Sequence, residues 1–173
     1  MEIFASLSLN IALLLIAAVC IFLIIAKAEL PLDSRRRQAV VGVFFGLAAV
    51  AVIEFPVYGP FGSAFDTRAA PLLVSTYYVG PLAGGITAIL GAAARLNVGG
   101  PAAIGGVASF GFYLVFAFLL RKYWGRYALG LSGLTILASG ATLSVLPSFF
   151  IGQSIAAGWK ILLTFWPILL AGN

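Results

Sequence analysis

Residues 66–101 read DTRAAPLLVSTYYVGPLAGGITAILGAAARLNVGGP, and this stretch decides the fold. It is apolar between Arg68 and Arg95 except for a break at Gly80-Pro81. As a single helix, its apolar run of about 26 residues would reach ~39 Å and cross a bilayer once. As two short helices that turn at the break, it would form a hairpin and bring both arginines to the same side.

The rest of the chain is as apolar as this stretch. Of its 173 residues, 62% are hydrophobic and 9% are charged, whereas soluble domains carry about 25% charged residues. Mean hydropathy is +1.13. The composition therefore predicts an all-α fold, a polytopic membrane helix bundle of about six transmembrane helices in one domain, residues 1–173. Outside the central stretch, helices are predicted at about 7–26, 38–55, 102–120, 129–151 and from 156 onward.

The basic residues indicate the orientation of the bundle. They cluster in two short loops at the ends of apolar runs, 27–37 and 121–126, and the second loop has no nearby acid. Because such loops stay cytoplasmic, both should lie inside an inner membrane. This favours a hairpin of two short helices near residues 69–94, with the N-terminus outside and the C-terminus in the cytoplasm. The net charge of +5 is thus explained by topology, and no nucleic-acid partner is predicted.

Several glycines have the spacing of close helix contacts. Gly42 and Gly46 form one small-residue face, and Gly80 and Gly84 form another. We expect these faces to pack helices of two copies against each other within the lipid bilayer, so that the chain forms a homodimer. A purely structural module that only holds a dimer together is therefore one candidate function.

Two arginines stand out as a candidate binding site. Arg68 and Arg95 flank apolar helices, where an ionisable group is costly and often marks a site. Guanidinium forks bind carboxylates or phosphates, so the pair suits a small anion arriving from outside, to which Ser109 would add a hydroxyl donor. Alternatively, Arg68 pairs with Asp66 or Glu54, and Arg95 extends to lipid head groups.

Other residues have simpler explanations. Gly99, Gly100, Gly105 and Gly106 would let a backbone approach a ligand, or would only pack helices. Asp66 also suits a helix N-cap. The chain has no histidine and one cysteine, and it lacks a nucleophile elbow and a phosphate-binding loop. We therefore predict no enzyme, no catalytic residues, no metal site and no cofactor.

The order of the short motifs resembles the LytS-type multi-helix membrane sensor domain. The motifs are Phe55-Pro56, the triplet Asp66 to Arg68 followed by Pro71, then Gly80-Pro81, and finally Arg95 before Gly99-Gly100. The resemblance covers about residues 38–173. It implies the N-terminal sensor region of a bacterial histidine kinase or diguanylate cyclase, without the output module.

The resemblance also implies a ligand site. The family includes kinases that sense extracellular pyruvate, and their ligand arginines correspond to Arg68 and Arg95. A pocket serine corresponds to Ser109, and Gly106 stands where those sensors have a cysteine. The predicted ligand-binding set is Arg68, Arg95, Ser109, Gly106 and Asp66.

Two functions of different classes are therefore predicted. The first is a signal-input domain that binds a small extracellular carboxylate and transmits the signal through its last helix. The alternative is the substrate-binding membrane subunit of a vitamin-type transporter, which would have a similar number of helices and an outward pocket.

Overall fold

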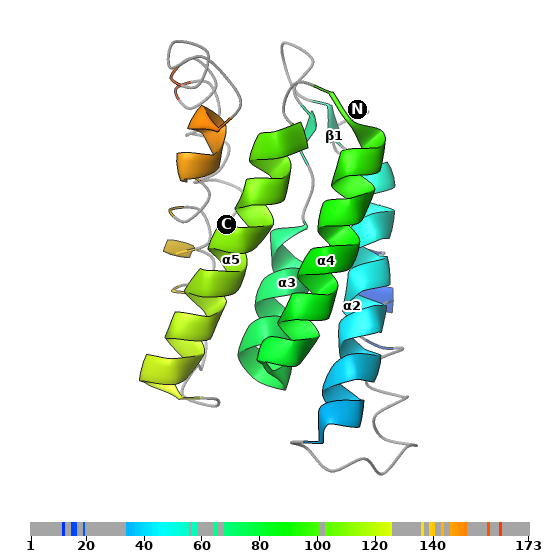
Figure 1. Ribbon diagram of the computed structural model, residues 1–173, viewed down its shortest axis with the longest axis vertical. Coiled ribbons are helices and arrows are strands. Elements are labelled where there is room, and N and C mark those ends of the chain that lie inside the picture. The colour runs from blue at the N-terminus through cyan, green and yellow to red at the C-terminus, as the bar shows by residue number, and fades with distance from the viewer. Residues whose placement is uncertain are drawn as a thin grey trace.

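A computed structural model of the chain describes residues 34–55, 57–58, 64–65, 68–100, 103–125 and 146–151, with single positions at 12, 15, 16, 19, 136, 139, 140, 143, 159 and 163. In this part of the chain, helices stand side by side and run alternately up and down (Figure 1). The elements are α2 (Arg35–Glu54), β1 (Val57–Tyr58), β2 (Ala64–Phe65), α3 (Ala69–Val74), the π-helix η2 (Ser75–Val79), α4 (Pro81–Val98), α5 (Ala103–Trp124) and the 3-10 helix η3 (Leu146–Phe150).

Helix α2 starts three residues earlier than predicted. The side chain of Ser34 accepts a hydrogen bond from the backbone nitrogen of Arg37 at 3.1 Å and so caps the first turn. The arginine triplet therefore belongs to the helix instead of preceding it. The helix ends at Glu54, as the proline at position 56 predicts.

Glycines of α2 bring it against α4. A Cβ atom on Gly42 would lie 2.8 Å from the carbonyl oxygen of Ala83, and Gly46 lies against the side chain of Leu90. The Thr87 hydroxyl spans the contact and donates to the Gly42 carbonyl at 3.1 Å. The predicted close approach at Gly42 and Gly46 is thus made within one chain, so a homodimer would have to use other faces.

The stretch between Arg68 and Arg95 is a hairpin. Helix α3 continues into η2, the chain turns at Gly80, whose φ of 148° suits glycine, and α4 begins at Pro81. The Gly80 nitrogen donates to the Ser75 carbonyl at 3.0 Å, five residues back, which is the π-helical spacing. The predicted hairpin is confirmed and the alternative of a single crossing is wrong, but only the first arm is short, because α4 extends to Val98 and is long enough to cross a membrane.

The two arms of the hairpin differ in length. The first arm, α3 with η2, has 6 and 5 residues, whereas α4 has 18. At helical rise these lengths are roughly 17 Å and 27 Å. Figure 1 accordingly shows α3 beginning well below the end of α4. The residue before α3 therefore lies inside the bundle.

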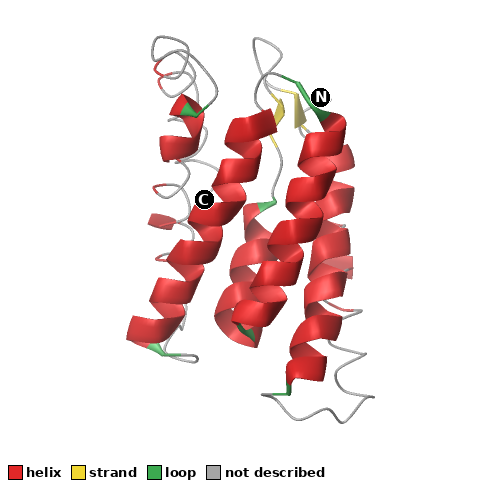
Figure 2. Cartoon of the chain, viewed as in Figure 1, coloured by secondary structure: helices red, strands yellow, loops and turns green. Residues whose placement is uncertain are grey.

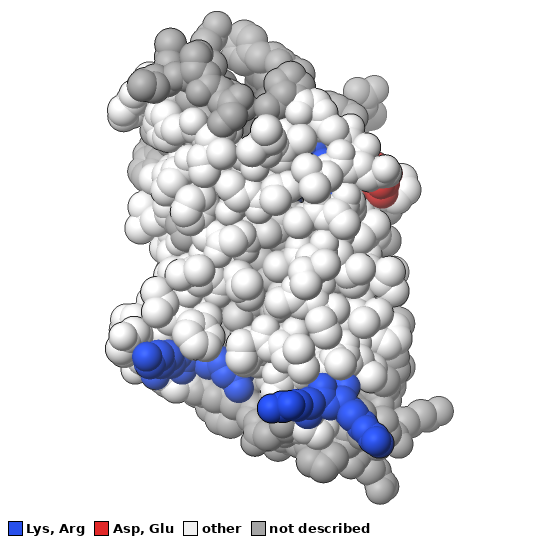
Figure 3. Space-filling view, viewed as in Figure 1, with Lys and Arg blue, Asp and Glu red and all other residues white. Residues whose placement is uncertain are grey.

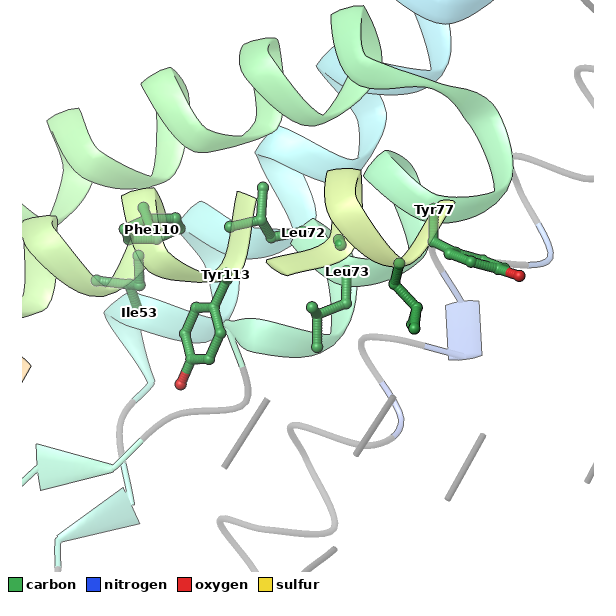
Figure 4. Close-up of a cluster of buried hydrophobic side chains, with 8 residues drawn as sticks. Ile53, Leu72, Leu73, Tyr77, Phe110 and Tyr113 are labelled. Atoms are coloured by element: carbon green, nitrogen blue, oxygen red, sulfur yellow. The ribbon is translucent and has the colours of Figure 1, made fainter. Parts of the chain in front are cut away.

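One apolar cluster fills the space between α3 and α5 (Figure 4). Leu72 and Tyr77 are fully buried in it, and Phe110 is 2% exposed. Burying side chains of this size fixes how the two helices face each other. The other members are Ile53, Leu73, Tyr113, Ala117 and Leu120.

A short strand pair is the one departure from helix in the described ranges. Strands β1 and β2 are antiparallel, with Val57 opposite Phe65 and Tyr58 opposite Ala64 (Figure 2). No strand was predicted from the sequence here. Two residues in each strand are too few to change the fold class, which is an all-helical bundle as predicted.

Three described helices are long and apolar enough to cross a membrane, namely α2, α4 and α5. The predicted spans 7–26 and 156–173, and most of 129–151, fall outside the described residues, so the count of six stays a prediction. The end of the 129–151 span differs from its prediction, because residues 146–150 form the 3-10 helix η3. Pro147 has no N–H to donate within an α-helix, which explains the change.

Basic side chains gather at one end of the bundle (Figure 3). Arg35, Arg36 and Arg37 begin α2, while Arg121 and Lys122 end α5, and these two helix ends lie at the same end of the molecule (Figure 1). The two basic loops were predicted to share one side of the membrane, and their described residues are arranged accordingly.

Candidate functional site: an arginine pair against helix α5

Arg68 is the residue immediately before α3, and its side chain is largely buried. Its guanidinium carbon lies 5.8 Å from the centre of the Phe110 ring, which is within the range of a cation–π interaction. Because the first arm of the hairpin is short, this charge sits within the bundle instead of at its rim.

Arg95 lies in the last turn of α4. Side chains on a helix tilt toward its N-terminus, so Arg95 points back along α4 and into the bundle. The turn that follows is closed by a hydrogen bond from the Gly99 nitrogen to the Arg95 carbonyl at 3.2 Å, with Gly99 at φ 70°. The glycine after the arginine thus ends the helix.

The two side chains meet at Gly106 of α5. A Cβ atom at this position would lie 2.7 Å from Nε of Arg95 and 2.9 Å from Nη1 of Arg68. These nitrogens are therefore at most about 5.6 Å apart, the sum of the two distances. Both are buried and make no hydrogen bond in the part of the chain that the structure describes, although both side chains make further interactions.

Gly106 leaves the room that this arrangement needs. Real Cβ atoms hardly ever approach other atoms closer than 3.0 Å, so any side chain at position 106 would displace both guanidinium groups. The site is thus formed by two arginines lying against a bare stretch of helix backbone.

Ser109, predicted to donate to a ligand, bonds within its own helix in this structure, and its contact with a ligand stays a prediction. It is 2% exposed, and its hydroxyl donates to the Gly106 carbonyl of the same helix at 2.6 Å. Its one proton is therefore used within α5, which leaves only its oxygen lone pairs for another partner. It supports the turn that carries Gly106.

Phe110 and Gly91 belong to the site but were not predicted. Phe110 lies one turn after Gly106, under Arg68, and Gly91 lies one turn before Arg95. A Cβ atom on Gly91 would overlap the Phe110 ring, so this glycine makes room for the aromatic ring. Positions four residues from an identified site residue share its helix face, and that spacing was the available signal.

Of the two acidic residues named as possible partners of Arg68, the structure describes Glu54. Glu54 is exposed and is the only acidic residue in the described ranges, while Asp66 lies outside them. Among the described residues there is no group of three or more histidine, cysteine or acidic side chains that could hold a metal ion.

A family model described as "5TMR of 5TMR-LYT" matches residues 22–172. It is the LytS-type multi-helix membrane sensor domain, so the resemblance predicted from the motif order is confirmed. The match favours a sensor over the transporter subunit that was the alternative. Neither a curated protein nor a solved structure matches the chain.

Proposed function

This chain belongs to the LytS-type membrane sensor family, and from that premise we propose that it binds a small extracellular carboxylate between Arg68 and Arg95 and passes the signal on through its last helix. The full-length protein would then be a histidine kinase or a diguanylate cyclase. The domain itself takes part as an input module and not as an enzyme.

The observation that supports the proposal is that the side chains of Arg68 and Arg95 meet at Gly106. Nε of Arg95 and Nη1 of Arg68 are at most about 5.6 Å apart, and at that separation two positive charges repel by about 3 kcal/mol at an effective dielectric constant of about 20. An anion placed between them replaces this repulsion with two attractions and accepts charge-assisted hydrogen bonds. A carboxylate has two oxygens, which suits two guanidinium groups, and pyruvate is the probe that the family suggests.

The charge distribution supports an external ligand. The 15 residues from Gly106 to Arg121 place the arginine pair ~22 Å along α5 from the basic end of the bundle. That distance is comparable to the apolar thickness of a bilayer, about 30 Å. With the basic end in the cytoplasm of an inner-membrane protein, the arginine pair is reached from the outer side.

A thermal-shift experiment tests the proposal. The detergent-purified protein is titrated with pyruvate, lactate, acetate and succinate, because a ligand that binds only the folded state raises its unfolding temperature. Arg68→Gln and Arg95→Gln remove the charge and keep most of the stem of the side chain. Lys122→Ala removes one positive charge at the other end of the bundle and is the matched control.

The proposal expects a rise with at least one carboxylate, lost in both arginine variants and kept in Lys122→Ala. A rise that persists in both arginine variants would place the anion elsewhere. No rise with any carboxylate would point to a sensor of the membrane state.

A further inference from the structure

Neighbouring glycines of α5 face different parts of the molecule. Successive residues of an α-helix are rotated by about 100°, so Gly105 and Gly106 point in different directions. Gly106 faces the arginines, whereas a Cβ atom on Gly105 would lie 2.6 Å from the Ser148 carbonyl oxygen and 3.1 Å from that of Ile151. One turn of α5 is therefore shared by the arginine pair and by the segment Leu146–Ile151.

The contact at Gly105 joins backbone to backbone. Both neighbours are carbonyl oxygens, which cannot rotate away as a flexible side chain can. Ser148 is 6% exposed, and the Ile151 nitrogen donates to its carbonyl at 3.2 Å. Only glycine allows so close an approach, so a movement of this turn of α5 has to move η3 or lose the contact.

Helix η3 is linked in turn to the C-terminal part of the chain. The rings of Phe150 and Trp159 pack edge to face, with their centres 5.7 Å apart. Figure 1 shows η3 beside the upper part of α5. Trp159 therefore lies next to the segment that contacts Gly105, and its fluorescence reports on that segment.

We propose that Gly105 is a positioning residue through which anion binding at the arginine pair is coupled to η3 and from there to Trp159. This inference rests on the proposed function. An anion that draws the guanidinium groups off the backbone at Gly106 changes the contacts of the turn Ala103–Gly106. Another face of that turn, about 100° around the helix, contacts η3. By reciprocity, a change at the η3 contact alters the affinity for the anion.

The test uses a protein in which Trp159 is the only tryptophan, with Trp124→Phe and Trp166→Phe. Titration with pyruvate is expected to change the Trp159 emission with a half-saturation at the dissociation constant, and the same dissociation constant should account for the rise of unfolding temperature with pyruvate concentration. Gly105→Ala is expected to abolish the emission change and to weaken pyruvate binding about tenfold, within the usual range of couplings between sites. Gly111→Ala is the control, because a Cβ atom there meets nothing within 4 Å.

The outcomes separate this inference from the proposed function. A thermal shift with no change in Trp159 emission, or a Gly105→Ala variant that behaves like Gly111→Ala, overturns the inference and leaves the anion site standing. Where Gly105→Ala does not fold, Phe150→Leu replaces it, and a full emission response to bound pyruvate in that variant overturns the link to Trp159.

If no carboxylate produces a thermal shift, the proposed function fails. A double-mutant cycle without ligand then decides whether Arg95 and Gly105 are coupled. Arg95→Gln and Gly105→Ala are made singly and together, and their unfolding temperatures are compared. Coupled sites give shifts that do not add. If the changes in unfolding temperature of Arg95→Gln and Gly105→Ala add, the inference is overturned. It is also overturned if Gly111→Ala combined with Arg95→Gln deviates from additivity by the same amount.

Discussion

Arg121 donates a hydrogen bond from Nη1 to the carbonyl oxygen of Tyr77 at 2.5 Å, and the Tyr77 hydroxyl donates to the Gly125 carbonyl at 2.5 Å. The turn of the hairpin is thereby fixed to the end of α5 at two points. The opposite end of α3 carries Arg68, which lies over Phe110 near the start of α5. The short arm of the hairpin is thus attached to α5 at both ends, and the two run parallel.

Tyr77→Phe should destabilise the bundle while leaving its packing intact. The ring stays buried, but one hydrogen bond is lost and the Gly125 carbonyl loses its donor, at a cost of about 1 kcal/mol. Thermal unfolding in detergent measures the loss. Tyr123→Phe makes the same change at a side chain that is 76% exposed, and equal effects of the two substitutions would contradict the role of the Tyr77 hydroxyl.

Adjacent glycines of α4 should respond in opposite ways to alanine. A Cβ atom on Gly84 would overlap Thr76, whereas one on Gly85 meets nothing within 4 Å. We expect Gly84→Ala to destabilise the protein by about 1–3 kcal/mol through overpacking. Gly85→Ala should stabilise it by up to about 1 kcal/mol, since alanine favours helix over glycine. Unfolding temperatures of the two variants are compared, and a stabilising Gly84→Ala would show that α4 does not approach η2 this closely.

Gly106→Ala should weaken ligand binding while the protein still folds. The added methyl group would lie 2.9 Å from Nη1 of Arg68 and 2.7 and 2.9 Å from Nε and Cγ of Arg95, so both arginine side chains have to shift. The moved guanidinium groups no longer present the same donors. The thermal shift with pyruvate is expected to become smaller, and the unfolding temperature without ligand is expected to fall. Gly111→Ala should retain the pyruvate shift, and an unchanged shift in Gly106→Ala would remove this glycine from the site.

Cysteine labelling tests the orientation. In a Cys20→Ser background, Asn97→Cys lies at the end of the bundle near the arginine pair, and Lys122→Cys lies at the basic end; both side chains are exposed. A membrane-impermeant maleimide added to intact cells should label position 97 only, because basic ends stay in the cytoplasm. Position 122 should react only after permeabilisation. The reverse pattern would exclude an external ligand site.

The sequence was sufficient to predict the hairpin and its consequence for the arginines. Glycine and proline at 80 and 81 are local signals of a turn, and the charge of the loop at 121–126 selected the hairpin over a single crossing. That both arginines lie toward the same end of the bundle follows from that topology alone, whereas the depth of Arg68 follows from the unequal arms. The family could be recognised because its motifs occur in a fixed order.

The remaining features leave no specific signal in the sequence. The π-helical turn at Ser75–Val79 is held by hydroxyl groups of Ser75 and Thr76, which both donate to the Leu72 carbonyl at 3.0 and 2.7 Å. Serine and threonine have many other uses in membrane helices, so they give no specific signal. Likewise, nothing local distinguishes Gly105, which faces η3, from Gly111, which faces open space.

The unequal arms of the hairpin have an electrical consequence. Arg68 lies roughly 10 Å below the end of α4, the difference between the two arm lengths. With the end of α4 at the edge of the apolar layer, an anion held beside Arg68 would have crossed about a third of that layer. A membrane potential of 100 mV acts on one elementary charge with about 2.3 kcal/mol over the full layer. A negative interior therefore opposes entry of the anion by roughly 0.8 kcal/mol per 100 mV. Occupancy of the arginine pair would then depend on how well energised the membrane is as well as on the ligand concentration outside.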